Sequence, residues 1–472
     1  MAQCEILLGR RGFMAGAGLT ALVTVLGASG NQAKAQVTGP AGSAELRAKA
    51  GTTRLRGPAQ PATAIVGFGG TVPGPTLRIR RGEEIRARLL NDWSEPTTIH
   101  WHGMRVPNGM DGVPYLTQSP IVPGQSIDYR FVARDAGTYW YHAAQVTQFE
   151  RGLSGPVIVE ENEPVAVDRD VLLMLADWHL SADGSLQNAR SGDMGQTVLT
   201  ANGNTQTAVA VRRGERVRLR LINATAGRLL RISVPEQTAW VMAIDGQPAE
   251  PFVAHDSQVM IAPGNRVDLF VDIAENAKAT VPVVVDTGNG AGTPVARLDV
   301  SNEAAAGSSR GAPRPLPPNP LPARIDLRNA LRVQAPLEIF QDAASGSTTK
   351  DGKKIPGGKA PAGPVISSWT PLDALTDRIP TPSFSVKRDR PVTLAFANPG
   401  PHASVIHVHG HAFRLLDNLD DGWKPFWLDT LLVAPQQTAR IAFVADAPGK
   451  WAIIRRSLSN PTRESLAWFE VA

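Results

Sequence analysis

The sequence predicts an all-β protein made of three consecutive β-sandwich domains. Its 472 residues include 44 Gly and 38 Pro without low-complexity runs, a composition that favours turns and short strands over long helices. Alternating apolar and polar residues, typical of half-buried strands, recur along the chain, and one such stretch returns in similar form further on. The length also exceeds what one hydrophobic core usually organises, since a domain has roughly 150 residues.

The first 35 residues are predicted to be an export signal and no part of the fold. Arg10 and Arg11 precede an apolar run that ends near Gly27, and Ala33-Lys34-Ala35 has the small-residue pattern of a cleavage site. This arrangement resembles a twin-arginine signal and predicts a periplasmic protein, with a retained signal anchor as the alternative. No later stretch has eighteen consecutive apolar residues, so we expect no transmembrane segment in the mature chain.

Charge and cysteine content exclude several kinds of chemistry. Residues 1–35 hold three of the 48 basic and one of the 43 acidic residues, so the remainder would carry a net charge near +3. Its basic residues are scattered through strand-like segments, and we expect no nucleic-acid partner. The single cysteine, Cys4, would leave with the signal, which excludes a disulfide or a thiolate in the mature chain. No phosphate-binding loop or Ser-His-Asp pattern stands out.

Two sequence markers each occur three times and define the repeat. The first marker is a turn followed by an alternating strand, at residues 79–91, 211–223 and, more faintly, 386–398. The second marker contains Pro-Gly or Pro-Gln, and it also leads into an alternating strand. It begins 43, 51 and 48 residues after the first, at Val122, Ala262 and Ala434. This repeat is longer than the roughly 20–50 residues of solenoid units, so it indicates duplicated whole domains.

The positions of the markers give the domain boundaries. We predict the first domain at residues 44–162, the second at 163–303 and the third at 323–472. Residues 304–322 are rich in Gly, Ser and Pro and are predicted to be a linker. A second such stretch, residues 343–363, is expected to be an exposed loop inside the third domain.

Five of the nine histidines occur in strand-like motifs. His100-Trp101-His102-Gly103 and His407-Val408-His409-Gly410-His411 share an HxHG pattern, and His142 ends Tyr139-Trp140-Tyr141-His142. Residues two apart on a strand face the same side, so each pair presents two imidazoles together. A single such histidine is more often a hydrogen-bonded core residue. Two pairs in the first and last domains instead indicate one shared metal site. The predicted metal ligands are His100, His102, His142, His407 and His409.

With these motifs the chain resembles the three-domain multicopper oxidases of the laccase type, over essentially the whole mature chain. The resemblance implies cupredoxin-like Greek-key β-sandwiches with a copper cluster between the first and third domains. It assigns the type-two copper to His100 and His407, and two ligands of one type-three copper to His102 and His142. The other type-three copper would keep His409 alone. The remaining type-three ligand positions fall on Ala144, Ile454 and Arg456.

The resemblance also implies that the type-one copper site is absent. Pro448-Gly449-Lys450-Trp451 and Phe469-Glu470-Val471 keep the family's frame at the C-terminus. A blue-copper centre needs a cysteine thiolate, which the mature chain lacks, so we do not expect four-copper laccase turnover. The positions that the family fills with His, Cys and His carry Ile454, Arg455 and Arg456, and the other type-one positions carry Ser404, Asn460 and Ser465.

Three charged residues near these positions have expected roles. Strand alternation places Arg455 and Arg456 on opposite faces, so Arg456 is expected to fill vacated type-three space with Asp111 as its counter-ion. Asp111 also matches the family's acidic residue that orients a ligand histidine and relays protons, although Asp before Gly is equally common in simple turns. Asp429 matches another family motif and is expected to have a structural role at a strand end.

Three functions follow as alternatives. The first is a degenerate oxidase that binds a single copper ion at the five histidines. The second is a periplasmic scaffold with a protein partner, like the exported copper-free members of the superfamily that support cell division. The third is an oxidoreductase that acts on a small molecule through mononuclear copper, and the sequence does not identify its substrate.

Overall fold

The computed structural model describes residues 43–187, 195–288, 290, 292–304, 311–337, 363–417 and 422–472. The predicted export signal and nearly all of the predicted loop at 343–363 lie outside the described residues. All described residues belong to one compact unit, Gln36–Ala472. No helix among them has the length and apolar character needed to cross a membrane.

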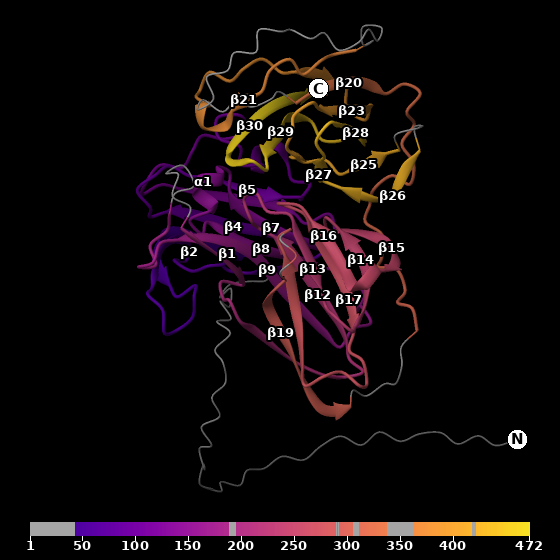
Figure 1. Cartoon of the computed structure of the whole chain (residues 1–472). Helices are drawn as coiled ribbons and strands as arrows, with labels where there is room; N and C mark the ends of the chain where they lie inside the picture. Colours follow the sequence, from indigo (N-terminus) through magenta and orange to yellow (C-terminus); the bar gives the residue numbers. More distant parts are fainter. Residues whose placement is uncertain are drawn as a thin grey trace, which may run out of the picture. The chain divides into compact units, whose positions relative to one another are not determined.

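The predicted all-β class is confirmed, because strands dominate and the few helices are single turns (Figure 1). Among the described residues, the helices are α1 (Val146–Phe149), η1 (Asn108–Met110), η3 (His255–Ser257) and η4 (Leu372–Ala374). The strands form six sheets, two in each of three consecutive regions of the chain. Each region is therefore a β-sandwich with its own buried core.

The first sandwich has one sheet in the order β2-β1-β4-β6 and another in the order β3-β8-β7-β5. Leu46 and Leu89 from the first sheet pack with Trp101 and Tyr141 from the second. The strands are β1 (Ser43–Thr53), β2 (Thr63–Phe68), β3 (Leu77–Arg80), β4 (Glu84–Asn91), β5 (Ile99–His102), β6 (Ser126–Val132), β7 (Gly137–Ala143) and β8 (Ser154–Glu160).

The second sandwich has sheets in the orders β10-β9-β12-β17-β14-β15 and β11-β19-β18-β13-β16. Its strands are β9 (Arg169–Leu180), β10 (Gln196–Ala201), β11 (Thr207–Arg213), β12 (Arg216–Asn223), β13 (Leu230–Ser233), β14 (Thr238–Ile244), β15 (Gln247–Val253), β16 (Gln258–Ile261), β17 (Arg266–Asp272), β18 (Thr280–Asp286) and β19 (Thr293–Ala304).

The third sandwich has sheets in the orders β20-β23-β28-β25-β26 and β21-β30-β29-β24-β27, with β22 also paired to β30. Its strands are β20 (Leu331–Pro336), β21 (Thr370–Pro371), β22 (Phe384–Val386), β23 (Pro391–Asn398), β24 (Ser404–Val408), β25 (Phe413–Leu416), β26 (Trp423–Leu428), β27 (Thr430–Val433), β28 (Gln437–Val444), β29 (Gly449–Ser457) and β30 (Asn460–Val471).

The two sequence markers have the same structural role in all three sandwiches. The first marker connects the two sheets of a sandwich, because its turn joins β3 to β4, β11 to β12 and β22 to β23. The second marker leads into β6, β17 and β28, which pair antiparallel with β4, β12 and β23. The repeated sequence therefore encodes one repeated pairing, as duplicated domains require.

Strand β12 departs from the prediction of a half-buried strand. Every residue of β12 is buried, including Arg216, Arg218 and Arg220. Arg218 donates to both oxygens of Glu161 at 2.9 and 2.8 Å, and Arg220 donates to Thr138 Oγ1 at 2.9 Å. The first sandwich thus covers the polar face of β12. The alternating sequence of β12 does not reveal this burial.

The described part of the predicted linker, residues 311–322, contains no helix or strand. Asn319 nevertheless exchanges hydrogen bonds with the backbone of Ala136 at 2.8 Å and donates to Gln247 at 2.9 Å. This segment therefore packs against both of the first two sandwiches.

Candidate metal centre

The structure gathers the five predicted histidines around one cavity of ≈ 40 Å³ between the first and third sandwiches. His100 and His102 lie on β5, and His142 lies opposite His100 on the neighbouring strand β7. His407 lies near the end of β24, and His409 follows it. All five side chains are buried. Residues some three hundred positions apart in the chain thus meet at one site.

The local structure explains why a glycine follows each HxH pair. Gly103 and Gly410 both adopt positive φ, 82° and 67°, which side chains other than glycine rarely accept. A Cβ at Gly410 would also collide with the ring of Trp451, and one at Gly103 would collide with the Arg266 guanidinium. Gly103 directly follows the last residue of β5, and Gly410 lies two residues after the end of β24, so both belong to the turns that follow the histidine strands.

The backbone contacts of His100 and His407 fix the proton on each ring. The Nδ1 atoms lie 3.0 Å from the carbonyl oxygens of Asp111 and Asp429, respectively. A carbonyl only accepts hydrogen bonds, so each neutral ring carries its proton on Nδ1 and leaves Nε2 as a bare lone pair. The two Nε2 atoms lie 3.0 Å apart.

Two bare lone pairs at this separation repel unless a cation lies between them. Nitrogen ligands bind zinc-sized ions at about 2.0–2.1 Å, so a 3.0 Å separation corresponds to an angle of about 95° at one shared ion. The His100–His407 pair therefore fits one shared metal ion.

His102 and His142 form a second pair of facing nitrogens. His142 donates from Nδ1 to its neighbour's carbonyl, Ala143 O, at 2.8 Å, so its Nε2 is bare. That Nε2 lies 3.2 Å from His102 Nδ1, while His102 Nε2 lies 2.9 Å from Thr430 Oγ1. The Thr430 hydroxyl donates to Asp429 Oδ1 at 2.8 Å, so His102 Nε2–H donates to Thr430 and His102 Nδ1 is bare as well.

Burial keeps His102, His142, His407 and His409 in the neutral form that binds metals. It lowers the pKa of His102 and His142 well below the ordinary value, and it lowers the pKa of His407. Burial also lowers the pKa of His409 to about 3, although the nearby Asp111 charge opposes this.

Asp111 contacts two of the histidines through its carboxylate. Its Oδ2 accepts from His409 Nδ1 at 2.9 Å, and its Oδ1 lies 3.3 Å from His100 Nδ1. Burial alone would raise the pKa of Asp111, but the interactions with His409 and His100 outweigh it and hold this pKa well below the usual value. The contact with His409 is one through which Asp111 could orient a ligand histidine, and both the orienting role and proton relay stay predictions.

The expected pairing of Arg456 with Asp111 is wrong. Arg456 contacts Glu464, with Nε donating to Oε1 at 3.2 Å, because the β29–β30 register places the two residues opposite each other. Asp111 is engaged by the two histidines instead. Arg456 also donates to Ala226 O at 3.1 Å. As expected, it lines the cavity together with Ile454.

Sequence reasoning missed Glu464, whose Oε2 accepts the backbone N–H of Val146 at 2.9 Å and which also lines the cavity. Arg456 and Glu464 lie on β29 and β30, on either side of a short turn, so a hairpin pattern in this segment was the available signal.

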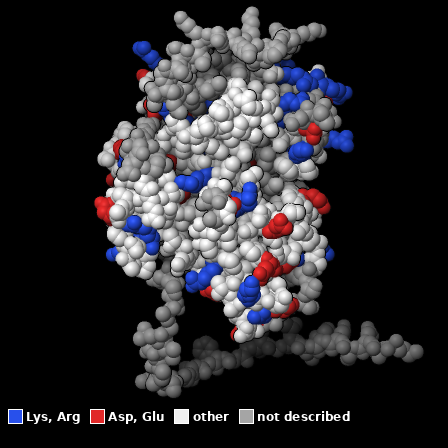
Figure 2. Space-filling model, viewed as in Figure 1, with Lys and Arg blue, Asp and Glu red and all other residues white. Residues whose placement is uncertain are grey.

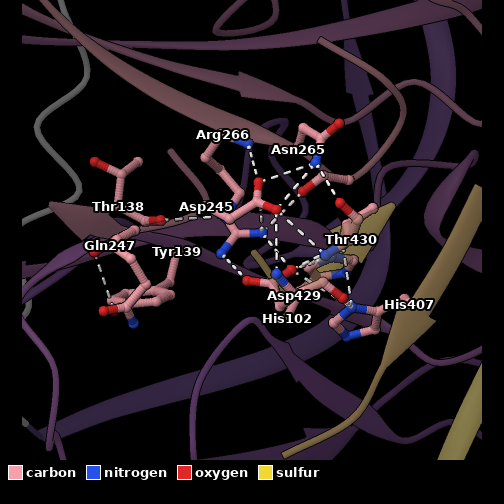
Figure 3. A network of polar contacts seen from close by, with 12 residues as sticks. His102, Thr138, Tyr139, Asp245, Gln247, Asn265, Arg266, His407, Asp429 and Thr430 are labelled. Carbon is pink, nitrogen blue, oxygen red and sulfur yellow. Dashed lines mark hydrogen bonds and ion pairs between the residues drawn. The ribbon is translucent and has the colours of Figure 1, made fainter. Parts of the chain in front are cut away.

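Sequence reasoning also missed a buried polar network behind the histidines (Figure 3). Arg266 of β17 is fully buried and donates to both carboxylate oxygens of Asp429, at 2.8 and 2.6 Å. Burial and the Asp429 charge raise the pKa of Asp245 to about 7. Burial opposes ionisation of Asp429, but Arg266 outweighs it and lowers the pKa of Asp429. The available sequence signal for this network was Arg266 itself, a charged residue in the strand that follows the second marker of the second sandwich.

The predicted type-one positions offer poor copper ligands. Ser404, Arg455 and Ser465 are buried, and Arg455 pairs with Ser465 across β29 and β30. Hydroxyl and guanidinium groups do not replace a thiolate and imidazoles, and the described part of the chain contains no cysteine.

The other four histidines do not line the cavity. His411 donates from Nδ1 to His409 O at 3.0 Å and packs among aromatic rings. The side chain of His255 is 95% exposed, His402 is exposed, and His179 contacts Thr197 at 3.3 Å. The expectation that His179, His255 and His402 are structural or exposed agrees with these positions.

Basic and acidic side chains are interspersed over the lower part of the face drawn in Figure 2. Several other arginines, including Arg218, Arg220 and Arg266, are buried in ion pairs. The expectation of no nucleic-acid partner stays a prediction.

Comparisons with known proteins identify relatives across the three sandwiches. Family models described as multicopper oxidase match residues 49–164, 169–300 and 361–453. The multicopper oxidase MmcO of Mycobacterium tuberculosis is 27% identical over 444 residues, which cover 83% of this chain and 80% of that protein.

Two solved structures are similar in both sequence and fold. A multi-copper oxidase from Pseudomonas thermotolerans is 31% identical with a TM-score of 0.74, covering 91% of this chain and 99% of that one. Lac15 from a marine microbial metagenome is 30% identical with a TM-score of 0.73, covering 90% and 99%.

Proposed function

The chain belongs to the multicopper oxidase family, and from this premise we propose that it binds a single copper ion between its first and third sandwiches and does not carry out four-copper laccase turnover. The observation that carries the proposal is the pair of bare Nε2 atoms of His100 and His407, 3.0 Å apart. Members of this family bind copper, and imidazole nitrogen is a suitable ligand for it.

The residues around the proposed ion would bind and orient it. His100 and His407 supply the two facing nitrogens, while Asp111 and the Asp429 carbonyl fix the orientation of their rings. Bound copper would supply one-electron redox chemistry. Mononuclear oxidation of a small molecule is therefore the alternative function, and its substrate stays open.

Two features argue against a full copper cluster. Arg456, which pairs with Glu464, occupies the cavity wall where the family resemblance places a type-three ligand, and a guanidinium offers a metal ion no lone pair. The type-one positions hold Ser404, Arg455 and Ser465 in place of imidazole and thiolate ligands. Both features support loss of electron entry and of the paired type-three coppers.

The proposed location is the periplasm, reached by twin-arginine export. It rests on Arg10, Arg11 and the apolar segment that follows them. Replacing both arginines with lysine is expected to keep the protein in the cytoplasm, as measured by cell fractionation. Unchanged export would contradict the proposal.

Metal content tests the copper proposal. The purified protein is loaded with copper, freed of excess metal, and examined by elemental analysis and electron paramagnetic resonance. We expect one copper per chain with no intense blue absorption, because no thiolate is present. Replacing His100 and His407 together with alanine should abolish this signal, whereas His255→Ala, at an exposed histidine, should not.

The same experiment separates the alternatives. Absence of bound copper would contradict the proposal and favour the periplasmic scaffold. Four coppers with blue absorption and oxygen uptake on a phenol would favour an active laccase. One copper with oxygen uptake would establish the mononuclear oxidase.

A further inference from the structure

We propose that the second sandwich, which supplies none of the five histidines, positions the metal ligands through Arg266 and its partner Asp429. This inference rests on the proposed function, since it concerns the same site. Arg266 lies on β17 of the second sandwich, and Asp429 lies between β26 and β27 of the third. The ion pair therefore joins two domains directly behind the histidines (Figure 3).

The pair is rigid because each of its members is held from several sides. Besides its two bonds to Asp429, Arg266 donates to Thr138 O at 3.2 Å and to Gly264 O at 3.0 Å. Asp245 accepts the backbone N–H groups of Asp429 and Thr430, both at 3.2 Å. The second sandwich thus holds both the side chain and the backbone of this short segment.

Asp429 transmits this positioning to two imidazoles, and the Thr430 oxygen contacts both, since it also lies 3.1 Å from His407 Nδ1. The Asp429 backbone carbonyl accepts from His407 Nδ1, which leaves His407 Nε2 bare. Its carboxylate accepts the Thr430 hydroxyl, so the Thr430 oxygen accepts from His102 Nε2 and leaves His102 Nδ1 bare. The Arg266–Asp429 pair therefore selects which nitrogen of each ring faces the cavity.

Gly103 provides independent support for this arrangement. It follows His102 directly, and a Cβ at this position would collide with both Arg266 Nη2 and Asp429 Oδ2. The Arg266–Asp429 pair fills the space beside the first HxHG turn. The glycine of that motif is thereby required by a residue of another domain.

Copper affinity tests the proposal. Thr430→Val removes the hydroxyl but keeps the shape, Thr430→Ser keeps the hydroxyl, and Asp429→Asn removes the charge that orients it. We expect Thr430→Val and Asp429→Asn to weaken copper binding by about 10–100-fold and to alter the paramagnetic resonance spectrum, as loss of ligand-orienting groups does. Thr430→Ser should stay within about threefold of the parent.

The matched control is Asp272→Asn. Asp272 accepts two bonds from the buried Arg216, at 2.6 and 2.8 Å, in the same sandwich, and it also accepts from Trp240 rather than from a histidine. Asp429 and Thr430, in contrast, contact His407 and His102 directly. This control should leave affinity and spectrum unchanged. Folded Thr430→Val and Asp429→Asn proteins that also keep both properties would overturn the proposal.

A copper-free measurement separates this inference from the proposed function. Nitrogen NMR of the ¹⁵N-histidine-labelled protein reports which ring nitrogen carries the proton. In the parent, His102 should be protonated on Nε2 and His407 on Nδ1, and Thr430→Val should change the state of His102 while Asp272→Asn does not. An unchanged His102 would overturn the inference, whereas failure of the parent to bind copper would overturn only the proposed function.

Discussion

Single residues in the cavity wall show how neighbouring charges set the chemistry of a site. Arg456 and Asp111 both lie near the histidines. Arg456 forms an ion pair with Glu464, while the Asp111 carboxylate contacts His100 and His409. The Arg456 charge is offset by Glu464, as burial in a low-dielectric interior requires. The Asp111 carboxylate accepts from the neutral imidazole of His409, so that imidazole does not offset its negative charge.

Acid should destabilise the copper-free protein. The folded-state pKa values of His102, His142, His407 and His409 lie below the unfolded value of about 6.5. The unfolded chain therefore binds more protons below about pH 6.5, and stability is lost as the pH falls below that value. The loss should approach about 1.4 kcal/mol per pH unit for each histidine.

Urea unfolding at a series of pH values measures this slope. For His409 the window extends down to its folded pKa of about 3. Replacing His409 with glutamine should make the slope shallower. A free energy of unfolding that is constant between about pH 6.5 and 5 would contradict the assignment of neutral, buried histidines.

Breaking the Arg456–Glu464 pair should be costly. Glu464→Gln leaves a mostly buried guanidinium without its counter-ion, and such losses reach about 3–5 kcal/mol. Asp326→Asn, in an exposed and solvent-screened pair with Arg328, should leave the free energy of unfolding nearly unchanged. Equal effects of the two variants on urea unfolding would contradict a structural role for the buried pair.

At the level of elements, an asparagine ends the same strand in all three sandwiches. Asn91, Asn223 and Asn398 close β4, β12 and β23. Each of the three asparagines is buried. Each side-chain amide donates one hydrogen bond to a backbone carbonyl in the loop that follows the strand. It donates another to the carbonyl of the residue just before the second marker. In each, Oδ1 also accepts a backbone N–H two residues later. The repeated asparagine therefore ties the two markers together.

Replacing this asparagine should destabilise the sandwich that contains it. Asn223→Ala removes bonds to Arg228 O and Ile261 O, at 2.9 and 3.0 Å, and leaves these acceptors without that donor. The expected loss is about 2–4 kcal/mol in the free energy of unfolding. Asn204→Ala, at an exposed turn, is the control and should cost less than about 1 kcal/mol. Similar thermal midpoints for both variants would count against this role.

At the level of the whole molecule, the histidine site depends on all three sandwiches. The first and third supply the imidazoles, and the second supplies Arg266 and Asp245 behind them. Copper bound here would link the first and third sandwiches and should stabilise the folded chain.

Copper should therefore raise the thermal midpoint of unfolding. At free copper one hundred times its dissociation constant, the gain is about 2.7 kcal/mol if the unfolded chain does not bind the metal. The double variant His100→Ala with His407→Ala should show no such shift. A shift that persists in the double variant would place the copper elsewhere.

The sequence by itself determined the all-β class, the threefold repeat and the five histidines, because strand alternation and motif spacing are local properties of the chain. It also placed Ile454 and Arg456 on the same face. Only the tertiary structure decided the partner of Arg456, the burial of the β12 arginines and the position of Arg266 behind Asp429. These features depend on which surfaces meet when domains distant in sequence pack together, and no local pattern records that.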